Sequence, residues 1–147
     1  MEEKLTEVML FANQNPSCWL ATSEDNQPHV RGMLMWFADE TGFYFHTAKA
    51  KGLFQQIQIN PKVEAAFIRD ADDPVNFASL RVTGLAEVVE DKELEKRLFL
   101  ERPWIWENIK QAGADTEVVI FRIVNGSAYI WNMSWNLKEK EAPRVTI

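Results

Sequence analysis

Turn-forming residues divide this chain into short apolar segments, and that division constrains the fold more than any other feature. Residues 25–28 (Asp-Asn-Gln-Pro) and 39–42 (Asp-Glu-Thr-Gly) each separate two apolar segments by a tight turn. Segments joined in this way pair as antiparallel hairpins, whereas a doubly wound sheet needs a helix after every strand. The sequence therefore predicts a β-barrel with added helices, an antiparallel α+β protein, in a single domain of residues 1–147.

Six segments have the length and residue types of strands. They cover residues 17–22, 30–38, 43–47, 63–69, 77–89 and 117–135. The last segment is either one long strand or a hairpin that turns at Asn125-Gly126.

Helical spacing of apolar residues predicts the remaining elements. These helices cover residues 3–14, 50–59, a stretch that begins after Asp91, and 104–111. Asp91 is a good N-cap for the third of them, which Pro103 ends or kinks. The charged tail, residues 138–147, is expected to be mobile at its end.

Composition excludes several classes of protein. One cysteine and two histidines in 147 residues leave no internal disulfide and no cysteine-rich zinc site, so no metal ligand is expected. The net charge of −6 argues against binding to nucleic acid or to an anionic membrane. No apolar run approaches the roughly 20 residues of a membrane helix, and the first residues form no basic leader. We therefore expect a cytoplasmic location.

Aromatic residues are abundant, with six Trp, nine Phe and two Tyr. They fit a large core, or else a flat ligand and a subunit interface. Trp104 and Trp106, which follow Pro103, either cover such a ligand or pack.

One segment is the richest in side chains that could bind a ligand: Phe43-Tyr-Phe-His-Thr47-Ala-Lys49-Ala-Lys51-Gly52. It predicts a strand, then a hydroxyl, then two lysines where a helix starts. A helix N-terminus offers free N–H groups and a positive potential, so this pattern suits a phosphate. The alternative is an ordinary helix start with solvated lysines.

Arg31 lies on the strand before this segment. Because side chains alternate along a strand, it shares a face with Met33 and Met35. A guanidinium suits a phosphate or a stacked ring system. The alternative is a charge that faces solvent.

Taken together, these segments resemble a known family. Cys18-Trp-Leu-Ala-Thr22, Gln27-Pro-His-Val-Arg31-Gly-Met33 and Gly42-Phe-Tyr-Phe-His-Thr47 follow one another as in the FMN-binding split barrels related to pyridoxamine 5'-phosphate oxidase. Leu80-Arg-Val-Thr-Gly84-Leu-Ala-Glu-Val resembles the long strand of that family. The resemblance implies a six-stranded split barrel that forms a homodimer, with FMN in grooves at the dimer interface.

The resemblance also implies cofactor-binding residues. They are Arg31, Gly32, Met33, Leu34, His46, Thr47, Lys49, Lys51, Gln56 and Trp131. Arg31 matches an arginine near the phosphate or ribityl chain, and backbone from Gly32 to Leu34 would run along the isoalloxazine ring. Residues 46–51 would surround the phosphate, Gln56 would lie near the flavin, and Trp131 would face it from the partner.

The chain departs from the oxidases at two places. Their paired basic residues sit one or two positions beyond Lys51, where this chain has Gly52 and Leu53. Its tail also has no histidine, so oxidation of pyridoxamine phosphate is not expected. The predicted function is a flavin-dependent oxidoreductase with an unknown small-molecule substrate and no identified catalytic side chain. The alternative is a stress-response protein, or one that binds flavin, heme or a deazaflavin without turnover.

Overall fold

The fold is an antiparallel sheet that curls into a barrel, seen in a computed structural model that describes residues 2–147. Its strands are β1 (Ser17–Glu24), β2 (Gln27–Leu34), β3 (Phe37–Asp39), β4 (Gly42–Ala48), β5 (Lys62–Arg69), β6 (Ala78–Val89), β7 (Val118–Asn132) and β8 (Val145–Thr146). The sheet order is β2-β1-β5-β6-β7-β4-β3, with β8 beside β7. The predicted α+β barrel is therefore confirmed, although two short strands, β3 and β8, add to the six expected.

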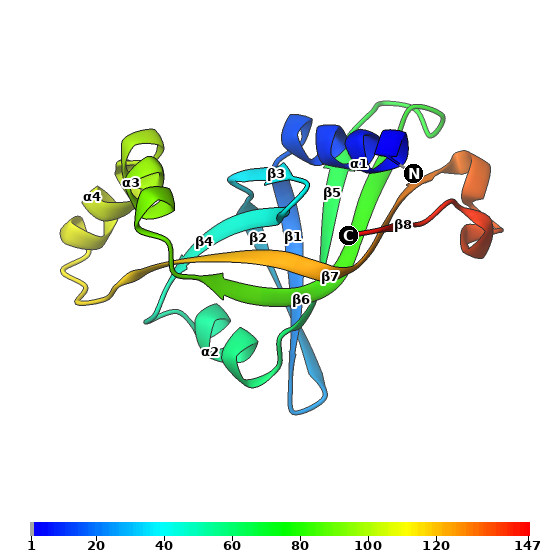
Figure 1. The fold of residues 1–147 in the computed structure, drawn as a ribbon. Helices are drawn as coiled ribbons and strands as arrows, with labels where there is room; N and C mark the ends of the chain where they lie inside the picture. The colour runs from blue at the N-terminus through cyan, green and yellow to red at the C-terminus, as the bar shows by residue number, and fades with distance from the viewer. Residues whose placement is uncertain (1) are drawn as a thin grey trace.

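Helices lie around this sheet, as Figure 1 shows. They are α1 (Glu2–Gln14), α2 (Gly52–Ile59), α3 (Lys92–Glu101) and α4 (Trp104–Gln111), with 3-10 turns η1 (Met133–Trp135) and η2 (Glu139–Glu141). Asp91 caps α3 as predicted, because its side chain accepts hydrogen bonds from the N–H groups of Glu93 and Leu94. No helix of residues 2–147 is long and apolar enough to cross a membrane.

The two edges of the sheet meet where the chain passes from β2 to β3. Met35 and Trp36 join these strands; Met35 N–H donates to Pro16 O at 2.9 Å, and Trp36 N–H donates to Tyr44 O at 2.8 Å. The prediction of one continuous strand over residues 30–38 is wrong at this point. Both linking side chains are buried, which breaks the in-and-out alternation of a strand.

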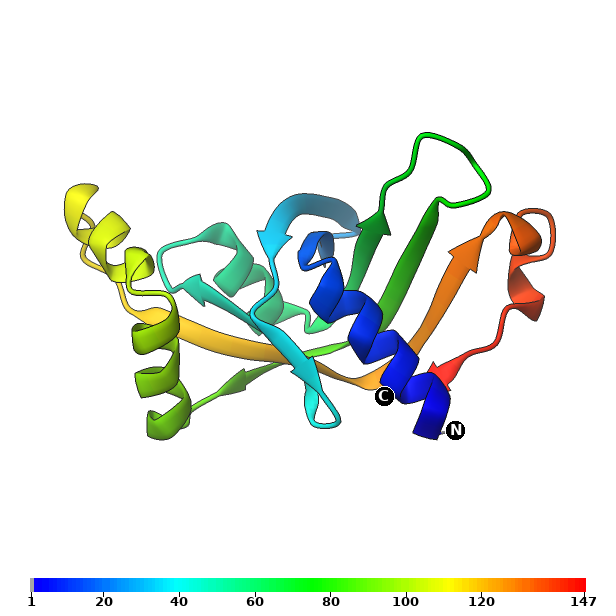
Figure 2. The ribbon, with the colours of Figure 1, turned by 90° about the horizontal axis from the view of Figure 1, so that it is seen from above.

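The barrel interior is filled by apolar side chains, several of which are phenylalanines. Phe43, Phe45, Phe67 and Phe121 are fully buried there. α1 and α2 lie on opposite sides of the curled sheet and add buried apolar residues to the same core (Figures 1 and 2). Part of the aromatic content therefore lies in the core, as one of the two interpretations predicts.

A second apolar cluster lies outside the barrel, where α3 and α4 pack. Leu98 and Ile105 contact Trp36, Tyr44 and Ile120 there. Figure 2 shows these helices at one end of the long β6–β7 ribbon and the C-terminal segment at the other. The two ends of the molecule are thus built differently.

β7 is one long strand and not a hairpin. Asn125 has a φ of 54°, and the pairing with β6 shifts register between Thr83 and Leu85. The two strands approach so closely here that a Cβ on Gly126 would lie 1.8 Å from Thr83 O. Asn125-Gly126 therefore forms a bulge instead of the alternative turn.

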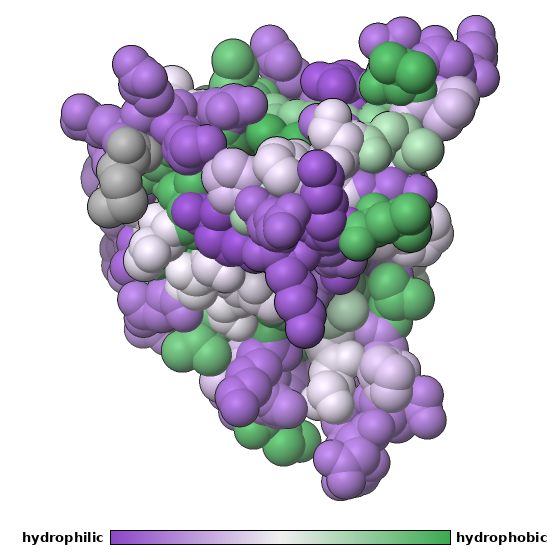
Figure 3. All heavy atoms as spheres, turned by 90° about the vertical axis from the view of Figure 1, so that its right-hand side faces the viewer, coloured by the Kyte–Doolittle hydropathy of each residue, from purple (hydrophilic) through white to green (hydrophobic). Residues whose placement is uncertain are grey.

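The tail is anchored, contrary to the expected mobility of its end. Val145 pairs with Ala128 of β7 and is buried, and Ile147 N–H donates to Gly126 O at 3.0 Å. Burial of an apolar residue two positions from the end explains the difference. On the face that carries this segment, hydrophobic side chains form separate islands among hydrophilic ones (Figure 3).

Candidate functional site

Arg31 is held in place by uncharged acceptors. Its Nη1 donates to Thr22 Oγ1 at 2.9 Å and to Leu20 O at 3.3 Å, and its Nη2 donates to Gln56 Oε1 at 2.5 Å. Thr22 also donates to Gln56 Oε1, at 2.6 Å. Burial lowers the pKa of Arg31 from its ordinary value. Arg31 of β2 and Gln56 of α2, which were both predicted to bind the cofactor, are thus in direct contact.

Local geometry explains this contact. Asp25 and Asn26 both have positive φ, 51° and 64°, as a two-residue hairpin turn requires. This turn sets the register in which Leu20 pairs with Arg31, so the guanidinium reaches β1. The sequence patterns did not single out Thr22, although the length of the turn would have placed it near Arg31.

Thr47 lies at the end of β4 with its side chain buried. Among residues 2–147, its Oγ1 is buried without a hydrogen-bond partner. α2 begins five residues later, and its N-cap Lys51 makes no side-chain capping bond. The predicted helix start at residue 50 is two residues early, because residues 49–51 form a turn in which Lys51 N–H donates to Ala48 O at 3.0 Å. A free hydroxyl and an uncapped helix start therefore occur close together in the chain.

The two lysines of this segment are placed differently. Lys49 forms an ion pair with Glu117, with 2.5 Å between Nζ and Oε2. Lys51 is exposed, and its charge contributes to the low pKa of His46. The charge of Lys51 thus acts on His46, whereas that of Lys49 is paired with Glu117, just before β7.

His46 contacts a residue that the sequence patterns did not single out. Its Nε2 lies 2.9 Å from Nη1 of Arg102, which follows the end of α3. Burial, then Arg102, then Lys51 lower the pKa of His46 to about 4. Trp104 approaches the imidazole edge-on, with 5.8 Å between ring centroids. No spacing rule links positions 46 and 102, since only the docking of α3 on β4 joins them.

Gly32, Met33 and Leu34 lie on β2, an edge strand of the sheet. Met33 packs against the barrel core, whereas Gly32 and Leu34 are exposed. Leu34 O accepts a hydrogen bond from Arg102 at 3.0 Å. This backbone is accessible from one side, as a flat ligand beside it would need.

The other two tryptophans behave differently from Trp104. Trp106 packs into the outer apolar cluster and against Phe99. Trp131 contacts Phe77, far from the other predicted residues. His46 pairs with Ile120, eleven residues before Trp131 on β7, which is about 35 Å along a strand. Within one chain, Trp131 is not brought to the site.

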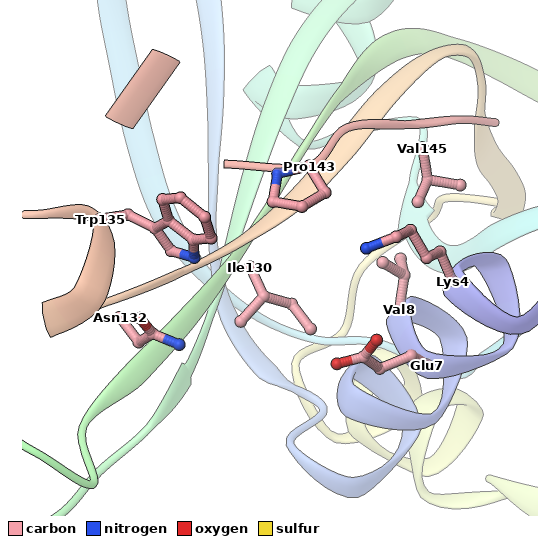
Figure 4. A pocket seen from close by; sticks show the side chains of 8 residues that line it. All are labelled: Lys4, Glu7, Val8, Ile130, Asn132, Trp135, Pro143 and Val145. Carbon is pink, nitrogen blue, oxygen red and sulfur yellow. The ribbon is translucent and has the colours of Figure 1, made fainter. Parts of the chain in front are cut away.

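A separate groove lies at this far end. It has a volume of about 210 Å³ and is bordered by α1, the end of β7 and the C-terminal segment. Figure 4 shows Lys4 and Val8 of α1 on one side, with Ile130, Trp135 and Pro143 on the other. It contains none of the residues predicted to bind a cofactor.

The geometry defines a split-barrel protein with positive groups gathered around β2, the end of β4 and the start of α2. A model of the pyridoxamine 5'-phosphate oxidase family matches residues 5–131. The chain belongs to this family, and that membership supports a flavin-binding fold. No curated protein matches the chain.

Solved structures with the same fold include several related barrels. A NimC/NimA family protein from Clostridium acetobutylicum is 20% identical, with a TM-score of 0.75 over 99% of this chain and 93% of that one. General stress protein 26 from Bacillus anthracis is 18% identical, with a TM-score of 0.67 over 97% and 98%. The heme storage protein HutZ from Vibrio cholerae is 19% identical, with a TM-score of 0.60 over 80% and 87%. At these identities the likeness concerns the fold alone.

The residues present fit a phosphorylated flavin. Arg31 carries a charge that its protein contacts do not neutralise, and Thr47 Oγ1 lacks a partner among the described residues. Heme fits less well, because Arg102 already occupies the Nε2 atom of His46.

Proposed function

We propose that this protein binds FMN and is a flavin-dependent oxidoreductase of the cytoplasm that acts on a small molecule. One observation carries the proposal: Arg31 is fixed by Thr22 and Gln56, without a carboxylate among its hydrogen-bond partners. A partly buried guanidinium held by neutral groups keeps its charge available to an anion. Membership in the oxidase family makes the phosphate of FMN the best match for that anion.

The phosphate is proposed to lie between Arg31, Thr47 and Lys51. Arg31 and Lys51 supply positive charge, and the first N–H groups of α2 add donors at the same place. Thr47 gains the hydrogen-bond partner that its Oγ1 lacks among residues 2–147. Lys49 contributes after it exchanges Glu117 for the ligand.

The flavin ring is proposed to lie along the backbone of Gly32, Met33 and Leu34, with His46 nearby. β2 is an edge strand, so part of its backbone is free to bond a ring with carbonyl and N–H groups. When bound, the flavin supplies the hydride or electron chemistry, and the protein positions it and shields it from water. No side chain of this chain is assigned as a general acid or base.

The active unit is proposed to be a homodimer. Trp19, Val30 and Leu34 expose 56%, 64% and 44% of their surface on neighbouring strands β1 and β2. An exposed apolar face beside a binding site is typical of a subunit interface. Trp131 would then reach the flavin from the second copy, because it is too distant within one chain.

An FMN titration followed by fluorescence tests this proposal. Protein purified without flavin is expected to quench FMN fluorescence and to bind riboflavin at least tenfold more weakly, since riboflavin lacks the phosphate. Equal affinity for both would refute the phosphate site. No binding of either flavin would refute flavin binding, and a Soret band in the spectrum of the protein as purified would indicate heme instead.

Two further measurements separate an enzyme from a carrier and a dimer from a monomer. Bleaching of the bound flavin by NADH or NADPH at catalytic rates supports an oxidoreductase, and a flavin that neither donor reduces supports the non-catalytic alternative. Light scattering during gel filtration is expected to give the mass of a dimer. A Trp19→Ser variant is expected to shift that mass toward the monomer, whereas Val75→Ser, on an exposed loop, is the matched control.

A further inference from the structure

Arg102 ties the end of α3 to the place where the barrel closes. It is the C-cap residue of α3, and Pro103 follows it. Its Nη1 donates to Leu34 O at 3.0 Å, and its Nη2 donates to Met35 O at 2.8 Å. Leu34 is the last residue of β2, and Met35 is the first residue of the link from β2 to β3. One guanidinium thus holds the backbone that the proposed function places beside the flavin ring.

The same guanidinium determines which form of His46 is present. Arg102 Nη1 lies 2.9 Å from His46 Nε2. An arginine N–H can only donate, so Nε2 must be the unprotonated acceptor nitrogen. The ring proton of the neutral imidazole is then on Nδ1.

Arg102 does not hydrogen-bond to the carboxylate of its neighbour Glu101, which has other partners. That carboxylate accepts a hydrogen bond from Arg97 at 2.7 Å and another from the indole N–H of Trp36 at 2.9 Å. Arg102 is therefore free to bind the backbone and the imidazole. Its pKa is lowered by burial, with a smaller opposing contribution from Glu101.

We propose that Arg102 is a positioning residue of the flavin site, which fixes His46 as a neutral imidazole with its proton on Nδ1 and holds the backbone of Leu34 and Met35. This inference rests on the proposed function for its meaning, since the group positioned is the flavin. His46 then offers the site a fixed hydrogen-bond donor and does not transfer protons near neutral pH. The low pKa of His46 agrees with this role.

Nitrogen NMR of the flavin-free protein tests the tautomer directly. The chain has two histidines, so a His29→Gln variant assigns the signals of His46. Nε2 is expected to show the shift of an unprotonated nitrogen and Nδ1 that of an N–H. A proton on Nε2 of His46 in the wild-type protein would by itself overturn the inference.

An Arg102→Met variant tests the cause. The His46 ring is expected to exchange between tautomers and its pKa to rise toward the ordinary value, because Arg102 is the second-largest cause of the low pKa. Arg97→Met is the matched control. Arg97 is a cation of α3 that pairs with Glu101, and none of its contacts in residues 2–147 is with His46. A His46 signal that changes equally in both variants contradicts the assignment.

Flavin binding provides a second readout. FMN affinity is expected to fall at least fivefold in Arg102→Met, with a shift of the flavin absorption maxima, and less than twofold in Arg97→Met. Loss of the Nδ1–H tautomer without any change in FMN affinity or absorption would overturn the positioning role. If the wild-type protein binds no FMN, the proposed function fails, whereas the NMR measurement still decides the tautomer.

Discussion

Arginines in two regions of the molecule have opposite environments. Near β2 and β4, Arg31 and Arg102 donate to backbone carbonyls, a hydroxyl, a carboxamide and an imidazole. On the outer faces of β6 and β7, Arg81 pairs with Glu64 and Glu139, and Arg122 pairs with Glu87. Within residues 2–147, Arg31 and Arg102 have no carboxylate among their hydrogen-bond partners, whereas Arg81 and Arg122 are paired with carboxylates.

The direction of the arginine pKa changes follows this difference. Burial lowers the pKa of Arg31 and of Arg102. Burial also opposes the charge of Arg81, but its hydrogen bond and attraction to Glu64 outweigh this, and its pKa is raised. Hydrogen bonds to Tyr44 and Glu87 raise the pKa of Arg122. A protein that leaves partly buried cations without a carboxylate gives up stability there, and binding of an anion can recover it.

The largest expected effect is on cofactor affinity. Arg31→Met should weaken FMN binding by about 2 kcal/mol, roughly 30-fold, because hydrogen bonds to a charged phosphate are lost. Arg122→Met should change it less than twofold, since its charge is already paired. Fluorescence titration measures both, and equal losses would erase the distinction between the regions.

For the stability of the flavin-free protein, we expect Arg122→Met to have a larger effect than Arg31→Met. Arg122→Met is expected to lower the free energy of unfolding by about 1 kcal/mol, because Glu87 and the hydroxyl of Tyr44 lose a donor. Arg31→Met should cost less than about 0.5 kcal/mol, since Thr22 still donates to Gln56. Urea unfolding of flavin-free protein measures both. A larger loss for Arg31→Met would mean that Arg31 serves the fold first.

Two buried threonines, one hydrogen-bonded and one not, allow a more specific comparison. Thr22 and Thr47 are 3% and 4% exposed, but only Thr22 is hydrogen-bonded within the described residues. Thr47→Val should therefore stabilise flavin-free protein by up to about 1 kcal/mol, whereas Thr22→Val should destabilise it by a similar amount. Thermal and urea unfolding give the sign of each change. Thr47→Val should also weaken FMN binding, and stabilisation without that loss would remove Thr47 from the site.

The last effect is expected only at acidic pH. His46 has a folded pKa of about 4, below its ordinary 6.5, so the unfolded chain takes up the proton first as the pH falls. Stability from this group is complete above about pH 6.5 and is lost between 6.5 and 4. At about 1.4 kcal/mol per pKa unit, the change from 6.5 to about 4 corresponds to at most about 3 kcal/mol of unfolding free energy, and the partial exposure of the imidazole lowers that figure.

A His46→Gln variant isolates this contribution. Because glutamine does not titrate, the variant should lack the extra loss of unfolding free energy between pH 6.5 and 4. His29→Gln, which leaves His46 in place, is the matched control. Identical pH dependence in wild type and His46→Gln would show that the imidazole is not held against the cations.

Sequence patterns predicted the elements whose signals are local. The turn at Asp25-Asn26, the capping aspartate Asp91 and the antiparallel pairing of the strands all follow from residues close in the chain. Predictions were wrong where distant packing decides. Residues 30–38 are interrupted by buried Met35 and Trp36, and the tail is anchored by Val145. The alternative turn at Asn125-Gly126 is a bulge, because β6 and β7 cross closely there.

In the candidate site, too, some residues could be predicted from the sequence and others depend on tertiary packing. Arg31 and Gln56 were predicted from the resemblance, and the structure brings them into contact. Lys49 was predicted with them, but its ion pair with Glu117 depends on where β7 begins. Arg102 could not have been found, because its contact with His46 spans 56 residues and depends on the docking of α3.

The sequence by itself determined an antiparallel barrel of short strands, the positions of most helices, and a basic segment that suits a phosphate. Alternation, turn residues and caps act over a few residues, so they can be read from the chain directly. Only the tertiary structure decided which charges stay unneutralised. Pairing of a charged group depends on what the fold brings within about 3 Å of it, and Arg31 and Arg102 meet neutral partners where Arg81 and Arg122 meet carboxylates.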